Sequence, residues 1–358
     1  MPGEETVAIL WLVSDPRLHP ASGSTAEPAP SSPFDWQLAA ALGLAAAFFG
    51  VEARSFFHRY PVPFRCAAAL YCCVILLAAW AVLPALPAGR ALVTRVLGRR
   101  GRPFLVLAAW VLPYLVYAAG CGDFRWSGLA RLLALCVPPL AIYCVLPPRN
   151  PAALSWQDAI AWSWLVLAVV LRRTGGIWNV PANLDFMARL AMIAVASWSW
   201  VFVRPVAGLG YRFSLSRQTV RAAAINFAGF AICGLPLAFA LRFAGWNPRW
   251  HGMAAFAAGY IEILVFIAWL EELFFRGFLQ SLLSARLGSP ARGHLAASLA
   301  FGLSHILLGA APNWRYVATA TLAGWFYGRA FRQSGNLTGP ALSHALVDAA
   351  WRTWFGLG

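Results

Sequence analysis

The chain has 358 residues, of which 60% are hydrophobic and 11% are charged. Soluble globular domains carry about 25% charged residues, so this composition excludes that class and predicts an all-α, polytopic transmembrane helical bundle. The formal net charge of +15 comes from arginines, since the sequence contains no lysine, and these arginines lie mostly between apolar segments. That placement is typical of membrane topology and argues against nucleic acid as a partner.

The predicted elements begin after an N-terminal stretch, residues 1–35, that is rich in Pro, Ser, Ala and Gly. This composition predicts a flexible tail, and the stretch lacks the basic start of a cleaved signal peptide. Apolar segments follow that predict about 10–11 spans, the last three being shorter and interrupted by Gly and polar residues. They cover residues 36–53, 65–87, 103–120, 129–146, 154–171, 187–204, 220–241, 253–283, 294–310, 316–331 and 339–356.

A Pro-rich stretch at 147–151 suggests a division of the bundle. The N-terminal transmembrane helices, 36–150, carry few ionisable residues inside their spans. The second part, 151–358, carries many after about residue 260, and its candidate site lies within 253–356. We therefore expect the chemistry of the chain in the second part.

The loops predict an orientation. Arginines cluster at 90–102 and again at 204–221, and the positive-inside rule places such loops in the cytoplasm. Alternation from these loops makes the N-terminus cytoplasmic, but it places the loop that carries Arg54, Arg59 and Arg65 outside, against the same rule. The use of Arg without Lys suggests a GC-rich bacterium, so we expect the bacterial inner (cytoplasmic) membrane.

The seven cysteines lie mostly within apolar stretches, at positions 66, 72, 73, 121, 136, 144 and 233. Their spacing is typical of neither a disulfide framework nor a metal site. The sequence therefore predicts small buried side chains without a disulfide bond.

A charged turn interrupts the apolar segment that starts near residue 253. It contains Glu271, Glu272 and Arg276. Charged side chains at the bilayer centre cost roughly 2.5 to 3.5 kcal/mol each, so they must face partners or water. Glu272 and Arg276 are spaced i,i+4 with the acid first, which predicts a pair on one helical face. Glu271 points about 100° away from that face and has no partner on its own helix, so its carboxyl group is available for proton transfer.

Three more ionisable residues lie at membrane depth in later segments. They are His305, within the predicted span 294–310, and His344 with Asp348, which share a helical face. A lone histidine in an apolar helix is more often a packing residue than a catalytic one. Here three segments each supply ionisable groups, and the need for partners brings such groups together inside the bundle.

Such a cluster suits hydrolysis of a peptide bond. Glu271 could take a proton from a water that His305 also holds, and the activated water would attack a carbonyl carbon. His344 could donate a hydrogen bond to the oxyanion, and Asp348 could orient His344 or, when protonated, donate as well. This chemistry needs neither a cofactor nor a metal.

The ordered motifs Glu271-Glu272-x-x-x-Arg276, Phe301-x-x-x-His305 and His344-x-x-x-Asp348 resemble those of the CAAX protease and bacteriocin-processing enzyme family, which includes the Ras-converting CAAX endopeptidases. The resemblance covers roughly residues 250–356. It implies a glutamate-type intramembrane protease with a membrane-associated protein or peptide as substrate. In that family the matching residues act as the general base, as its partner on the water, and as the oxyanion site. The resemblance therefore implies Glu271 as the general base, His305 as its partner on the water, and His344 with Asp348 at the oxyanion site. Glu272 and Arg276 would support the site.

The last position of the motifs, Asp348, is within the family pattern but bears on the oxyanion role. Members have Asn or Asp at the last position, and the Asp348 of this chain is an acceptor when ionised. A wider stretch, which includes 202–205 and 208–213, also resembles the bacterial branch associated with exosortase protein-sorting systems.

Other readings of the same residues stay open. A non-catalytic membrane chaperone, sorting or immunity partner could use the buried charges to bind a peptide terminus, and a proton-coupled transporter could use Glu271, His305 and His344 as a relay. The two glutamates, two histidines and Asp348 could also hold a divalent metal. A serine site at Ser304 and an aspartyl site at Asp123 are weaker alternatives.

Overall fold

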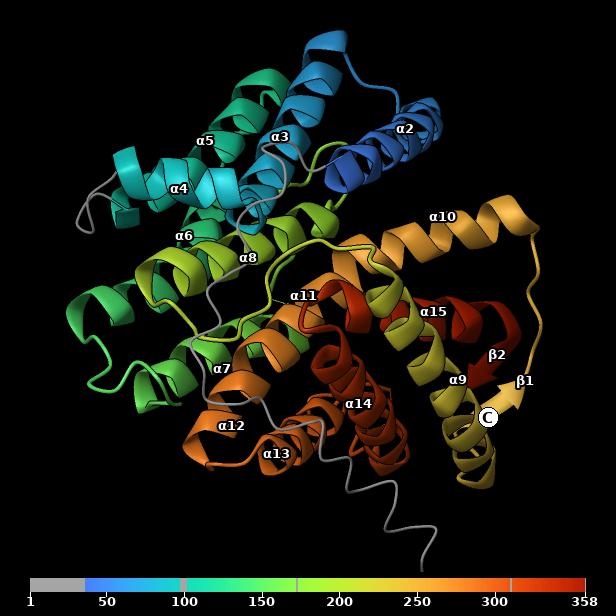
Figure 1. Ribbon diagram of the computed structural model, residues 1–358. Coiled ribbons are helices and arrows are strands. Elements are labelled where there is room, and N and C mark those ends of the chain that lie inside the picture. The colour runs from blue at the N-terminus through green and yellow to red at the C-terminus, as the bar shows by residue number, and fades with distance from the viewer. Residues whose placement is uncertain (1–35, 97–101, 172, 310, 358) are drawn as a thin grey trace, which may run out of the picture. The chain divides into compact units, whose positions relative to one another are not determined.

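The computed structural model describes residues 36–96, 102–171, 173–309 and 311–357, and the predicted N-terminal tail, 1–35, lies outside this range. The residues from Trp36 onward form one compact unit. Helices dominate it, which confirms the all-helical class (Figure 1). In the first half they are α2 (Trp36–Arg59), α3 (Phe64–Val82), α4 (Pro87–Val96), α5 (Arg102–Cys121), α6 (Trp126–Val145), α7 (Trp156–Val170) and α8 (Asp185–Trp198).

The second half contains α9 (Arg217–Ala240), α10 (Met253–Ile263), α11 (Trp269–Glu272), α12 (Ser281–Arg286), α13 (Pro290–Leu303), α14 (Trp314–Ser334) and α15 (Thr338–Trp354). Short 3-10 or π-helical segments continue several of them: η2 (Leu83–Ala85), η3 (Ser199–Val203), η4 (Leu264–Ala268) and η5 (Leu273–Gln280). The strands β1 (Ala244–Trp246) and β2 (Phe355–Leu357) pair antiparallel, with Gly245 opposite Gly356.

Five described helical segments are long and apolar enough to cross a membrane: Phe64–Ala85, Trp126–Val145, Asp185–Val203, Arg217–Ala240 and Met253–Arg286. This number, found among the described residues, is smaller than the predicted 10–11, and two further apolar stretches, Leu107–Cys121 and Trp156–Val170, are described over 10–17 residues. The three predicted spans at the C-terminus correspond to α13, α14 and α15, whose sequences include Gly, Ser, Thr, His and Arg. Such helices are shielded from lipid by their neighbours.

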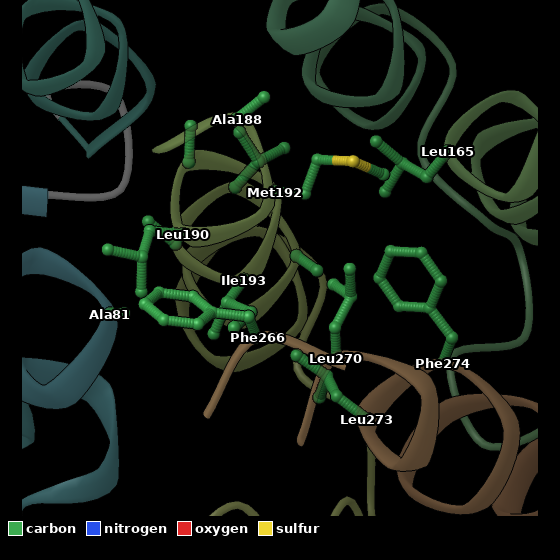
Figure 2. Close-up of a cluster of buried hydrophobic side chains, with 14 of the residues drawn as sticks. Ala81, Leu165, Ala188, Leu190, Met192, Ile193, Phe266, Leu270, Leu273 and Phe274 are labelled. Atoms are coloured by element: carbon green, nitrogen blue, oxygen red, sulfur yellow. The ribbon is translucent and has the colours of Figure 1, made fainter. Parts of the chain in front are cut away.

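The helix α8 lies at the centre of the packing. Every residue from Leu190 to Trp200 is buried, which explains its almost continuous apolar sequence. Figure 2 shows its side chains between Ala81 of α3, Leu165 of α7 and Phe266 of η4. Leu270 and Leu273 belong to the same cluster and are at most 2% exposed. The core thus fixes both neighbours of the Glu271-Glu272 pair.

A disulfide bond joins Cys66 to Cys121, so the prediction of no disulfide is wrong. The sequence separation of 55 residues conceals the pairing. It becomes possible because α3 and α5 pack together and place the first turn of α3 beside the last residue of α5. Among the other cysteines, Cys73 and Cys136 are buried as predicted, whereas the side chains at 72, 144 and 233 are exposed on their helices.

A buried ion pair connects the loop after η3 to the first turn of α7. Arg204 donates to both carboxylate oxygens of Asp158 at 2.7 Å, and its Nη1 donates to the Pro151 carbonyl oxygen at 2.8 Å. Asp158 also completes the capping box that starts α7 at Ser155. The loop at 146–155 and the loop after η3 therefore lie at the same end of the bundle.

Candidate active site

The two glutamates lie on α11, a single helical turn between the π-helical segments η4 and η5. A π-helical turn is wider than an α-helical one and is frequent at functional sites. In Figure 1 this segment lies in the middle of the bundle, and α11 contacts both α8 and α15. The charged turn is therefore enclosed by helices, as its sequence requires.

Glu272 pairs with Arg276, which confirms the i,i+4 prediction. Arg276 Nε lies 3.1 Å from Glu272 Oε2, and the two side chains are 1% and 0% exposed. The guanidinium carbon also lies 4.4 Å from the centre of the Phe301 ring, and Nη2 donates to the Gly324 carbonyl oxygen at 3.1 Å. A buried ion pair is tolerated only with such additional partners.

Small residues on α14 allow this close packing. A Cβ atom on Gly324 would lie 3.0 Å from Phe301 and 3.4 Å from the Arg276 guanidinium. A Cβ on Gly328 would collide with the imidazole of His294. Gly324 and Gly328 stand four residues apart, a small-residue motif that is typical of close helix contacts, and such a contact is found here.

His344 occupies the centre of the charged cluster. Its Nδ1 lies 2.7 Å from Glu272 Oε1, and its Nε2 faces Asp348 Oδ2 at 3.4 Å and Glu271 Oε2 at 3.9 Å. Because a carboxylate can only accept, Nδ1 carries the hydrogen of the bond to Glu272. The Tyr327 ring stacks on the imidazole with 4.5 Å between centroids. The ring is thus held by one carboxylate and one aromatic face, while Nε2 points toward the other two acids.

His305 lies in the turn between α13 and α14, and its side chain is half-buried. Its Nδ1 lies 2.8 Å from the Phe301 carbonyl oxygen, which must accept, so Nε2 is left with its lone pair. Phe301 lies between the histidines, with its ring centroid 4.9 Å from His305 and 5.8 Å from His344. Among the described side chains no polar contact joins His305 to Glu271, so the structure brings His305 to the cluster through aromatic contacts.

The side chains of the cluster differ in exposure. The Asp348 side chain is 39% exposed and that of Glu271 is 25% exposed, whereas His344 and Glu272 are 4% and 0% exposed. Exposure therefore falls from Asp348 and Glu271 toward Arg276. A reactant can reach Asp348 and Glu271, which both face His344 Nε2, but not Glu272.

Sequence reasoning missed the Tyr327 ring and the bond between Glu272 and His344. Tyr327 stands beside Gly328 in the small-residue motif. That motif was the available signal that this part of α14 packs closely against another helix. No local pattern predicts the bond, because Glu272 and His344 are 72 residues apart.

The weaker alternatives lie outside this cluster. Asp123 accepts from the Tyr117 hydroxyl and from Arg125 Nε at the end of α5. Ser304 Oγ donates to the Phe301 carbonyl oxygen at 2.7 Å and has no contact with His344 among the described residues. No group of three or more His, Cys, Asp or Glu side chains in the described ranges has the arrangement of a metal site.

A cavity of about 790 Å³ lies beside the site but does not include its residues. Its wall comes from α2, α3, α8, α10, η4, α15 and the loops at 183–184 and 249–252, and it is mainly apolar, with eight Phe, Tyr and Trp side chains. On α15 the wall begins at Ala349, the residue after Asp348. Glu262 and Arg352, which also line it, form an exposed ion pair at 3.0 Å.

Comparison with known proteins gives one match. Residues 190–350 match the family model described as "Rce1-like: Type II CAAX prenyl endopeptidase Rce1-like". This range includes all six site residues that the sequence predicts: Glu271, Glu272, Arg276, His305, His344 and Asp348. Neither the curated proteins nor the solved structures gave a match.

Proposed function

We propose that this chain, whose residues 190–350 belong to the Rce1-like type II CAAX endopeptidase family of glutamyl intramembrane proteases, cleaves a peptide bond in a membrane-associated protein or peptide. The observation that carries the proposal is the imidazole of His344, which lies within 3.9 Å of carboxylate oxygens from Glu271, Glu272 and Asp348. In this proposal the helices of 36–150 support a catalytic part formed by 151–358.

Glu271 is the general base of the proposed reaction. Its carboxylate is 25% exposed, and its nearest charged partner is His344 Nε2 at 3.9 Å, so it is free to take a proton from water. His305 Nε2 is the second group proposed to hold that water, since Nδ1 is occupied by the Phe301 carbonyl oxygen. The water then attacks the peptide carbonyl carbon, and the C–N bond breaks as the proton taken by Glu271 passes to the leaving amine. No covalent enzyme intermediate forms.

His344 is the proposed donor to the oxyanion, as an imidazolium that carries a hydrogen on Nε2 as well as on the Nδ1 that donates to Glu272. The bond from Nδ1 to Glu272 fixes the ring plane and aims Nε2 at the more exposed side chains of the cluster. In acyl-transfer enzymes, preorganised donors of this kind often lower the activation barrier more than any other group in the site. Glu272 and Arg276 are positioning residues because neither is accessible to a reactant.

The proposed link to exosortase protein sorting rests on the resemblance of residues 202–213 to the exosortase-associated branch of the family. In the structure these residues support the fold: Arg204 binds Asp158, and the Tyr211 hydroxyl donates to the Ala81 carbonyl oxygen at 2.7 Å. The proposed location is the bacterial inner membrane. If the link holds, the substrates carry sorting segments.

The test compares the N- and C-terminal peptides of the membrane proteome in cells that express the wild-type chain, Glu271→Gln or His305→Ala. Glu262→Gln is the matched control, because it makes the same change nine residues earlier at an exposed ion pair. We expect one set of termini to vanish in the first two variants and to persist in the control. Unchanged termini with both variants present in the membrane would reject the endopeptidase and favour a binding role for the cluster.

A proton-coupled transporter is the rival reading of the same residues. It predicts substrate flux in proteoliposomes that follows a pH gradient and is lost in Glu271→Gln. Peptide hydrolysis without a gradient distinguishes the endopeptidase from it.

A further inference from the structure

We propose that Tyr316 is a further catalytic residue, whose hydroxyl donates a hydrogen bond to the attacking water. This role rests on the proposed endopeptidase function, in which Glu271 and His305 hold that water. Three observations carry it: contacts that fix the Tyr316 ring beside His305, a hydroxyl without a described protein partner, and a lone pair of the water that the other two residues leave unbound.

The ring of Tyr316 is held beside His305. It belongs to the first turn of α14, and its centroid lies 4.7 Å from that of the His305 ring and 4.9 Å from that of the Phe243 ring. Asn313 connects the two site residues. Its backbone N donates to the Ile306 carbonyl oxygen at 2.8 Å, and its Oδ1 accepts from the Tyr316 backbone N at 3.0 Å. The turn that carries His305 is therefore tied to the start of α14.

The same face of α14 carries a second tyrosine, Tyr327. Eleven residues separate it from Tyr316, which is about three helical turns. Tyr327 stacks on His344 and is 1% exposed, so a reactant cannot reach it. Tyr316 is only partly buried. The helix thus places one tyrosine ring against each histidine of the site, and Tyr316 is the more accessible of the two.

The hydroxyl of Tyr316 has no hydrogen-bond partner among the described residues. Burial apart, the charges that act on it are those of Asp348 and Glu271, the two more exposed acids of the cluster. Polar groups inside proteins are almost always hydrogen-bonded, so a hydroxyl of this kind binds water or a reactant. A phenylalanine would make the same ring contacts, and packing therefore does not account for the hydroxyl.

The hydrogen bonds of the attacking water give this hydroxyl its role. In the proposed reaction the water donates one hydrogen to the Glu271 carboxylate and the other to His305 Nε2, which keeps its lone pair. Of the two lone pairs of the water, one attacks the carbonyl carbon and the other accepts from the Tyr316 hydroxyl. The three residues together leave the attacking lone pair as the free one. No proton leaves the phenol, because Glu271 takes the proton of the water.

The test removes the hydroxyl alone. Tyr316→Phe keeps the ring contacts, and Tyr260→Phe is the matched control, because Tyr260 is a partly buried tyrosine on α10 whose hydroxyl faces the Leu342 carbonyl oxygen at 3.5 Å. The probe is a synthetic peptide that spans a terminus lost in Glu271→Gln. The values of kcat and KM are measured across a range of pH on purified protein in micelles. Unfolding of the same preparations is measured alongside, so that each rate refers to folded protein.

We expect Tyr316→Phe to lower kcat about 100-fold, the cost of a misplaced reactant, with KM and the acidic limb of the pH profile unchanged. Tyr260→Phe should match the wild-type chain. A kcat of Tyr316→Phe within about threefold of wild type overturns the role, and so does a raised KM at unchanged kcat, because the hydroxyl then binds substrate. An acidic limb that moves to higher pH also overturns it, because the hydroxyl then stabilises a carboxylate in its charged form.

Failure of this role is distinguishable from failure of the endopeptidase function. If the wild-type chain cleaves the peptide, Glu271→Gln does not, and Tyr316→Phe cleaves as fast as wild type, the function stands and the role of Tyr316 is wrong. If no terminus depends on Glu271, or if the wild-type chain does not cleave the peptide, the function fails and the role of Tyr316 fails with it.

Discussion

Glu271 and Glu272 are adjacent in sequence, and replacing each with glutamine should have opposite consequences. Glu272→Gln keeps the size of the side chain but removes the charge that faces Arg276 Nε at 3.1 Å, where both side chains are at most 1% exposed. Leaving a buried charge without its partner costs about 3–5 kcal/mol. Glu271→Gln changes a side chain that is 25% exposed and 3.9 Å from its nearest charged neighbour. A pair of that kind contributes at most about 1 kcal/mol.

The two variants should therefore differ by at least about 2 kcal/mol in the free energy of unfolding, which is roughly a 30-fold difference in the ratio of folded to unfolded protein. The assay is unfolding of the purified protein in mixed micelles with increasing denaturing detergent, together with peptide hydrolysis on the same preparations. Glu271→Gln should unfold like the wild-type chain and be inactive. The reasoning is refuted if Glu272→Gln lies within about 1 kcal/mol of wild type, or if Glu271→Gln is the less stable variant.

Four further variants probe the scaffold with the same unfolding assay. Gly302→Ala should lose about 1–3 kcal/mol, because its Cβ would collide with Thr321 Oγ1; stability equal to wild type would contradict this close approach. Cys66→Ser and Cys121→Ser should each lose about 2–5 kcal/mol and should match the wild-type chain measured under reduction, whereas unequal losses would point to effects other than the disulfide. Arg276→Lys keeps a positive charge but not the planar group over an aromatic ring, so it should be less stable than wild type and more stable than Glu272→Gln.

Local spacing explains which parts of the site the sequence could predict. The pair of Glu272 with Arg276 follows from an i,i+4 interval, and the shared face of His344 and Asp348 follows from the same interval, so both are visible without tertiary structure. The bond from His344 to Glu272 depends on how α15 packs against α11. That packing is set by surfaces of small and aromatic residues, whose partners the sequence does not reveal.

The span count and the disulfide differ from prediction for a related reason. Hydropathy identifies a segment that lipid can surround, whereas α13 and α14 tolerate polar residues because other helices cover them. Cysteine spacing identifies local frameworks, whereas Cys66 and Cys121 meet only because two helices pack together over a separation of 55 residues. In both cases the information lies in contacts between helices.

Asp348 gives the most specific test of the proposed oxyanion site. Its Oδ2 lies 3.4 Å from His344 Nε2, the nitrogen that the proposal assigns to the oxyanion. An ionised carboxylate can only accept, so Asp348 competes with the oxyanion for that donor, whereas an asparagine amide could itself donate. Asp348→Asn should therefore retain or raise the rate of hydrolysis, and Asp348→Ala, which removes the group that orients Nε2, should lower it about 100-fold.

The measurement is the rate constant for peptide hydrolysis at saturating substrate, with the unfolding free energy of each variant as the control. A merely structural role for Asp348 predicts that both substitutions alter stability and activity together. If Asp348→Asn is as inactive as Asp348→Ala while both remain folded, the carboxylate itself is required. The donor at this site would then be His344 alone. Asp348 would be needed in its charged form to hold the imidazole on one side, while Glu272 fixes it on the other.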